Sequence, residues 1–149
     1  MEVKRWRVFL DTSALIAGIV SPTGAAREVL RLAEARLIHL VVSRQALTEA
    51  DRNLAAKLPV LLPEYSALLR AFDPLVVEDP DRAAVREATK VIHHKDAPIL
   101  AAALAAHVDY LVSWNTRHFQ TSAVRRFVPF PIVTPGEFLQ AFRSLLPNL

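Results

Sequence analysis

Short apolar runs alternate with longer helical segments along the whole chain, and this alternation limits the possible folds more than any other feature. The runs are Trp6–Leu10, Leu37–Val42, Leu75–Val77, Tyr110–Val112 and Pro131–Val133. Strands that are separated by helices pair in parallel, because a parallel crossover needs about a dozen residues. The pattern therefore predicts a three-layer α/β/α fold with a central, mainly parallel five-stranded sheet.

The segments between these runs predict the helices that would cover the sheet. Capping residues, prolines and apolar spacing give Ala14–Val20, Ala25–Ala35, Ser43 to about Leu58, Pro63 to Phe72, Arg82 to about His93, Ile99–His107 and Pro135 through Leu146. The length of 149 residues suits one domain, 1–149. A hydrophobic content of 52% excludes a disordered chain, and the absence of Cys excludes a disulfide scaffold or a thiolate zinc site.

The sequence contains no obvious membrane or export signal. The longest apolar candidate, Ala97–Val112, is interrupted by His107 and Asp109 and is shorter than the roughly 20 apolar residues of a membrane span. We therefore expect a soluble cytoplasmic protein with no membrane partner. The formal net charge of +3 is compatible with a polyanionic partner and does not require one.

Acidic and amide side chains follow or flank the predicted strands. Asp11 comes directly after the first strand, Glu49 lies on the helix that leaves the second, Asp96 precedes an alanine-rich helix, and Asn115 follows the fourth strand. In a parallel sheet, ligands bind beyond the carboxyl ends of the strands. Carboxylates gathered there repel one another unless a cation lies among them, and oxygen ligands suit Mg²⁺ or Mn²⁺.

Each of these residues also has a simpler interpretation. Asp11 and Asp96 stand where a helix begins, so either could be only an N-cap. Glu49 could be a solvated helical residue, with Asp51 as a rival for any role in the site. Asn115 could cap the turn that follows it. The constellation, rather than any single residue, favours a functional site.

Other catalytic patterns are absent from the sequence. His93 and His94 are adjacent, so on a helix they would point about 100° apart and could not easily share an ion. No His-Glu-x-x-His pattern, glycine-rich dinucleotide motif or P-loop motif occurs. Histidine-bound metal and nucleotide cofactors are therefore not expected.

Four segments, in order, resemble the PIN domain family. They are Arg7–Ser13 (RVFLDTS), Val41–Ser43 followed by Ala46–Glu49 (VVS and ALTE), Lys95–Ala103 followed by Ala106–Ser113 (KDAPILAAA and AHVDYLVS), and Pro131–Leu139 (PIVTPGEFL). Any one of them is a weak signal, but together they span nearly the whole chain. The last segment is similar to the ending common in the toxin branch of this family.

The resemblance implies a metal-dependent endoribonuclease, often the VapC-like toxin of a toxin–antitoxin pair. It makes Asp11, Glu49 and Asp96 the acidic metal ligands, with Mg²⁺ or Mn²⁺ as cofactor and Ser13 as a supporting polar residue. The fourth metal-ligand position, commonly Asp in the family, is Asn115 here. Asn can ligate through its carbonyl oxygen but adds no negative charge.

Cations beside the proposed acids are candidates for RNA phosphate contacts. They are Arg44, Lys95 and Arg117. Each could equally be an ordinary solvated surface charge. Trp114 could stack on a base, although packing against the sheet edge is the more common fate of such an aromatic.

Two other classes of function remain open from the sequence. A PIN-like module that binds RNA or protein with little or no cleavage is the main alternative, and Asn115 is the residue that favours it. The resemblance also implies a homodimer and a small antitoxin partner. Apolar residues of the early helices could serve such association, although core burial would explain them equally well: Leu15, Ile16, Ile19 and Val20.

Overall fold

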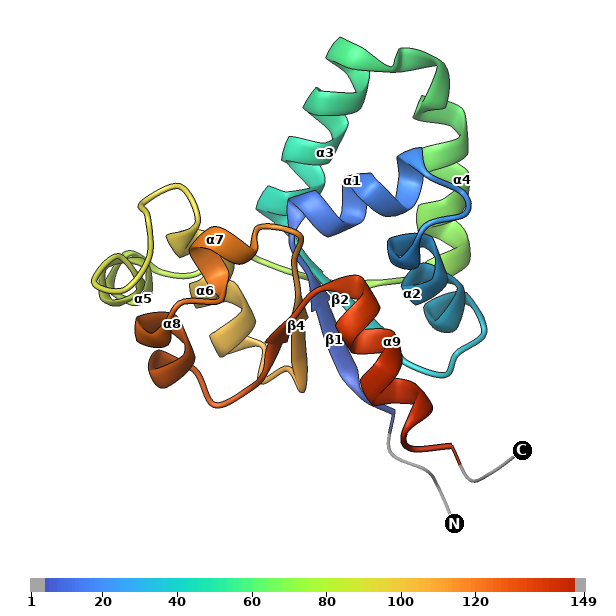
Figure 1. Ribbon diagram of the computed structural model, residues 1–149. Helices are drawn as coiled ribbons and strands as arrows, with labels where there is room; N and C mark the ends of the chain where they lie inside the picture. Colours follow the sequence, from blue (N-terminus) through green and yellow to red (C-terminus); the bar gives the residue numbers. More distant parts are fainter. Residues whose placement is uncertain (1–4, 147–149) are drawn as a thin grey trace.

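The structure is a computed structural model that describes residues 5–146 (Figure 1). Within this range the strands form one five-stranded sheet in the order β3-β2-β1-β4-β5, and every neighbouring pair is parallel. The strands are β1 (Arg7–Leu10), β2 (His39–Ser43), β3 (Leu75–Val77), β4 (Tyr110–Val112) and β5 (Ile132–Val133). The predicted α/β/α architecture is confirmed.

Helices cover both faces of the sheet. One face carries α1 (Thr12–Val20), α2 (Ala25–Glu34), α3 (Arg44–Lys57), α4 (Leu62–Phe72) and α9 (Pro135–Arg143), with a 3-10 turn, η1 (Pro59–Leu61), between α3 and α4. The other face carries α5 (Arg82–Ala88), α6 (Ala97–Ala105), α7 (Thr116–Phe119) and α8 (Ser122–Phe127). The two groups lie on opposite sides of the strands in Figure 1.

The central strands divide their side chains between these two layers. In β1, Val8 and Leu10 pack with the α1, α2 and α9 layer, whereas Phe9 packs with the α6 layer. In β2, Val42 packs with the α1, α2 and α9 layer, whereas Val41 packs with the α6 layer. This follows from the two-residue period of a strand, and burial on both faces explains why these runs are continuously apolar.

The strand order reverses between β1 and β4. From β1 the chain moves to β2 and β3 on one side, and β4 and β5 add on the other. The helices that leave β1 and β4 therefore start next to each other and open a crevice at the carboxyl ends of these strands. Asp11, Glu49 and Asp96, the acids predicted from the sequence, lie around this crevice.

Several predicted boundaries were wrong. The helix expected from Arg82 to about His93 ends at Ala88, and turns carry the chain from there to Asp96. The Thr89 hydroxyl donates a hydrogen bond to the backbone oxygen of Arg86, which gives the backbone an alternative to further helix. The short helices α7 and α8 were not predicted, because neither is long enough to show a periodic pattern.

Smaller shifts affect three further elements. The strand predicted from Leu37 begins at His39, and the final helix ends at Arg143 rather than Leu146. The helix α6 ends at Ala105, and His107 adopts a left-handed backbone with φ of 52°, which prevents the helix from continuing to that residue. None of the helices formed by residues 5–146 is both long and apolar enough to cross a membrane.

Candidate functional site

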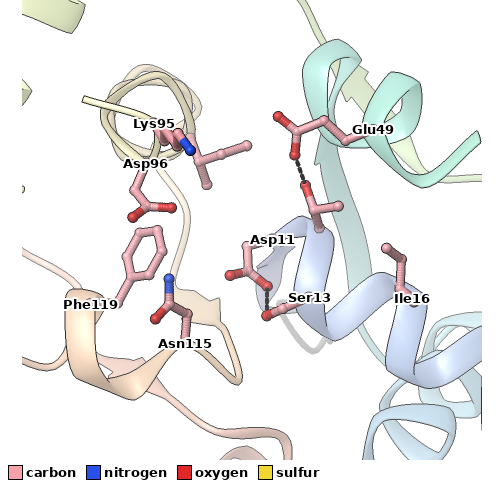
Figure 2. Close-up of a pocket in the computed structure, with 10 residues that line it drawn as sticks. Asp11, Ser13, Ile16, Glu49, Lys95, Asp96, Asn115 and Phe119 are labelled. Carbon is pink, nitrogen blue, oxygen red and sulfur yellow. Dashed lines mark hydrogen bonds between the residues drawn. The ribbon is translucent and has the colours of Figure 1, made fainter. Parts of the chain in front are cut away.

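A pocket of about 270 Å³ opens at the crevice between β1 and β4 (Figure 2). It brings together all three acids predicted from the sequence, together with Asn115, Ser13 and Lys95. Its lining residues are Asp11, Thr12, Ser13, Ile16, Glu49, Lys95, Asp96, Ile99, Asn115 and Phe119. The tertiary structure thus gathers residues that are more than a hundred positions apart in the chain.

Asp11 forms the floor of the pocket and also caps a helix. Its Oδ1 accepts hydrogen bonds from the Ala14 amide at 2.9 Å and from the Ser13 hydroxyl at 2.7 Å, while Oδ2 accepts one from the Ser113 hydroxyl. Asp11 is only 4% exposed. Capping and a place in the site, which the sequence left as alternatives, are both true of Asp11.

Burial raises the pKa of the Asp11 carboxyl above its ordinary value, and the negative charge of Asp96 raises it further. The hydrogen bonds from Ser113, Ala14 and Ser13 oppose this shift because they stabilise the ionised form. A carboxylate has about four acceptor positions and these donors take three of them. Asp11 therefore keeps acceptor capacity for one more positive group.

Two serine hydroxyls connect Asp11 to the loop that follows β4. Ser13 Oγ accepts a hydrogen bond from the Trp114 amide at 3.1 Å, and Ser113 Oγ accepts one from the Asn115 amide at 2.9 Å. Ser113 was missed by sequence reasoning as a site residue. Its position at the end of β4, level with Asp11 at the end of β1, was the available signal.

Glu49 reaches the pocket from the second turn of α3. Its Oε2 accepts a hydrogen bond from the Thr12 hydroxyl and its Oε1 one from the Gln45 amide, both at 2.8 Å. Figure 2 shows Glu49 on the opposite side of the pocket from Asp96, with Asp11 between them. The rival residue Asp51 is exposed and is not part of the pocket lining.

Asp96 occupies the N-cap position of α6 but makes no capping hydrogen bond with its side chain. Its Oδ2 instead lies 2.8 Å from Nδ1 of His118. The interpretation of Asp96 as only a helix cap is therefore wrong. The carboxylate faces the pocket and a neighbouring imidazole, which sequence reasoning did not predict.

Asn115 likewise makes no capping hydrogen bond with its side chain. Its Nδ2 lies 3.2 Å from the same His118 nitrogen. Asn115 and His118 are three residues apart across one helical turn, and this spacing could have identified the pair from the sequence.

The predicted RNA-contact residues occupy different surroundings. Lys95 lines the pocket. Arg44 pairs with Glu78 at 3.0 Å on the exposed surface, and Arg117 is exposed on α7 outside the pocket lining. Trp114 is 47% exposed, so packing against the sheet edge does not describe it.

The acids surround the pocket rather than forming a closed cage. Among residues 5–146, no three His, Asp or Glu side chains form a group that could hold a metal ion by themselves. In the same part of the chain, Asp11, Glu49 and Asp96 form no ion pair with Lys or Arg. Mg²⁺ is commonly bound through one or two carboxylates and several waters, so this oxygen donor set suits such an ion.

The acidic pocket lies at the reversal of strand order in a parallel α/β sheet, which is where ligands bind in folds of this class. The sequence model of the PIN domain matches residues 7–117, which cover β1 through the start of α7. The chain belongs to the PIN domain family. PIN domains are generally nucleases, and they typically use divalent metals.

Solved structures of low sequence identity share the fold. A chain of the crystal structure of VapBC2 from Rickettsia felis bound to a DNA fragment from their promoter matches with a TM-score of 0.63 and 16% identity, covering 85% of this chain and 96% of that one. PAE2754 from Pyrobaculum aerophilum matches with a TM-score of 0.52 and 18% identity, covering 93% and 96% respectively. A search of curated proteins found no match.

Proposed function

We propose that the protein is a Mg²⁺- or Mn²⁺-dependent endoribonuclease that hydrolyses RNA phosphodiester bonds. The observation that carries the proposal is that Asp11, Glu49 and Asp96 line one pocket and form no ion pair with Lys or Arg among the described residues. Three carboxylates in one small pocket repel one another, so a divalent cation would stabilise them. Membership of the PIN family supports the same chemistry.

Asp11 and Asp96 are the residues that would hold the ion directly, since both have free acceptor positions and Asp96 raises the pKa of Asp11 by its charge. Glu49 and Asn115 would contribute directly or through bound water. When bound, such an ion lowers the pKa of a coordinated water and neutralises charge on the phosphate. No Ser, Cys or His nucleophile is required.

The remaining residues would orient the acids and the substrate. Thr12 and Gln45 fix the Glu49 carboxylate, which can accept a hydrogen bond from an attacking water. Lys95 at the pocket wall is the candidate for a scissile phosphate contact, with Arg117 and Arg44 farther out along the RNA backbone. The exposed Trp114 can stack on a base.

The test is cleavage of a fluorescently labelled structured RNA by purified protein in Mn²⁺, with and without EDTA. Wild type is compared with Asp96→Asn, and Asp51→Asn serves as the matched control because it changes a nearby acid outside the pocket lining. We expect EDTA and Asp96→Asn to abolish cleavage and Asp51→Asn to preserve it. Equal cleavage by wild type and Asp96→Asn would refute the site assignment.

A second candidate is a PIN-like module that binds RNA or protein without cutting it. Two observations favour it: Asn115 stands in place of the usual fourth acid, and the described side chains do not by themselves form a closed metal site. Filter binding on the same labelled RNA separates the two functions. Binding without cleavage by both wild type and Asp96→Asn would support the module.

We also propose that the protein acts in the cytoplasm as a homodimer and as the toxin partner of a small antitoxin protein. The similarity in fold to a chain of the VapBC2 complex supports an antitoxin partner. Leu15 and Ile19 are buried in the core and Ile16 lines the pocket, so among the early apolar residues only Val20, at 42% exposed, is available for association. Light scattering, alone and after co-expression with the product of the adjacent reading frame, tests both partners.

A further inference from the structure

His118 contacts Asp96, the proposed metal-binding acid that lies on the opposite side of the pocket from Glu49 (Figure 2). Its Nδ1 lies 2.8 Å from Oδ2 of Asp96, although the residues are 22 positions apart, with His118 in α7 and Asp96 at the N-cap of α6. The His118 side chain is 43% exposed and that of Asp96 is 21% exposed. The contact therefore lies at the rim of the pocket, where a partner can orient the carboxylate without closing the site.

Asp96 has no other described side-chain hydrogen bond. Its N-cap position would ordinarily direct the carboxylate to the first amides of α6, but that bond is not made. Asp11 and Glu49, in contrast, each accept hydrogen bonds on both carboxylate oxygens. The orientation of Asp96 therefore depends on His118 more than on any other side chain of residues 5–146.

We propose that His118 is a positioning residue, which holds one oxygen of Asp96 so that the other faces the ion-binding side of the pocket. This inference rests on the proposed function. An ionised carboxylate only accepts hydrogen bonds, so Nδ1 carries the hydrogen and donates it. The same nitrogen then has no lone pair for the Asn115 amide nitrogen 3.2 Å away, so Asp96 is the group that the ring holds.

The assignment to Nδ1 can be tested by substitutions that either keep or remove a hydrogen-bond donor at this position. The amide nitrogen of Asn lies as many bonds from Cα as Nδ1 of His, so His118→Asn keeps a donor near the same place. His118→Phe keeps a ring but removes the donor. His94→Phe is the matched control, because His94 is another exposed ring, packs on His93, which in turn stacks with His118, and has no described contact with a carboxylate.

Mn²⁺ binding by titration calorimetry is measured for the four proteins, together with kcat and KM on the labelled RNA. Substitution of a residue that orients a metal ligand typically lowers the metal affinity or the activity by about 10- to 100-fold. We expect His118→Phe to weaken Mn²⁺ binding by about that factor and to lower kcat while KM for RNA changes little. We expect His118→Asn to retain most of the wild-type affinity for Mn²⁺. We expect His94→Phe to match wild type in Mn²⁺ affinity, kcat and KM.

Wild-type Mn²⁺ affinity in His118→Phe, or equal losses in His118→Asn and His118→Phe, would overturn the positioning role. If wild type itself binds no Mn²⁺, the proposed function fails on its own. Crystal structures of wild type and His118→Phe then decide the inference separately. A displaced Asp96 carboxylate in His118→Phe supports positioning, and an unmoved one overturns it.

Discussion

Ser113 and Asp11, which are 102 positions apart, are joined by a hydrogen bond from the serine hydroxyl to Oδ2 of the aspartate. Ser113 is 1% exposed and Asp11 is 4% exposed, so the bond is buried and removal of the hydroxyl leaves Oδ2 short of a hydrogen-bond partner. The bond also links the ends of β1 and β4, the strands between which the pocket opens. One buried contact therefore serves both the fold and the site.

Replacement of this serine tests both roles. We expect Ser113→Ala to lower the free energy of unfolding by about 1–3 kcal/mol, because a buried acceptor loses its partner. Mn²⁺-dependent cleavage should fall as well, since the hydroxyl stabilises the ionised form of Asp11. Urea denaturation and the RNA assay measure the two effects. A variant with wild-type stability and activity would contradict this account.

Asp11 itself should reduce the stability of the metal-free protein. Burial raises its folded pKa above the ordinary value, so its ionised form is less favourable in the folded than in the unfolded state. This cost is present at neutral pH, diminishes as pH falls through the raised pKa, and vanishes below the unfolded pKa. In EDTA at pH 7, we expect Asp11→Asn to unfold at the same denaturant concentration as wild type or a higher one.

The same pair of proteins reports metal binding. An ion that binds only the folded state raises its melting temperature by mass action. Mn²⁺ should therefore raise the melting temperature of wild type and leave that of Asp11→Asn unchanged, while RNA cleavage by the variant is lost. Equal shifts in the two proteins would place the ion elsewhere.

Gly18 sets the close approach of α1 and α2. A Cβ on this residue would lie 2.5 Å from Cδ1 of Leu30 and 3.3 Å from the backbone oxygen of Ala26. Leu30 is fully buried, so it has little room to move. We expect Gly18→Ala to cost about 1–3 kcal/mol in the free energy of unfolding. Gly136→Ala is the control, because nothing lies within 4 Å of its added Cβ and the variant should be neutral or slightly more stable.

Glu137 should give the protein a small stability increment that depends on pH. Its pKa is lowered first by the hydrogen bond from the Thr134 amide and then by the one from the Gln120 side chain. The increment is present above the unfolded pKa and is lost as pH falls through the lowered folded pKa. Because the residue is exposed, we expect Glu137→Gln to cost only about 0.5 kcal/mol at pH 7. In urea titrations the difference should shrink as pH falls below the ordinary pKa of a glutamate carboxyl, and a pH-independent difference would contradict the prediction.

Trp114 provides an optical test of RNA binding. Its indole is 47% exposed beside the pocket, whereas Trp6 packs against Tyr110 at 4.7 Å between ring centroids. In EDTA, a short single-stranded RNA should quench the tryptophan fluorescence of Trp6→Phe, in which Trp114 is the only tryptophan, because a stacked base quenches indole emission. Trp114→Phe should show little change. Quenching confined to Trp114→Phe would exclude stacking on this residue.

The strands could be predicted from a local pattern, whereas the three acids could be predicted only as a set, from their placement beside the strands and the ordered resemblance to the PIN family. Continuous apolar runs indicate strands buried on both faces, and Asp11 follows its strand directly. The short helices α7 and α8 and the early end of α5 could not be predicted, since fewer than two turns carry no periodic signal. Ser113 and His118 were missed for a related reason: their roles depend on contacts with residues far away in the chain.

The layered parallel architecture could be derived from the sequence, because hydrophobic periodicity acts between neighbours along the chain, and the candidate acids followed from their placement beside the strands and from the resemblance to the PIN family. Which side chains share the pocket, and which groups hold them there, depends on how the separate elements pack together. The distance between Asp96 and His118, and the burial that shifts the pKa of Asp11, arise from packing between separate elements. Hydrogen bonds and desolvation depend on positions in space, and residues distant in the chain acquire those positions only when the sheet assembles.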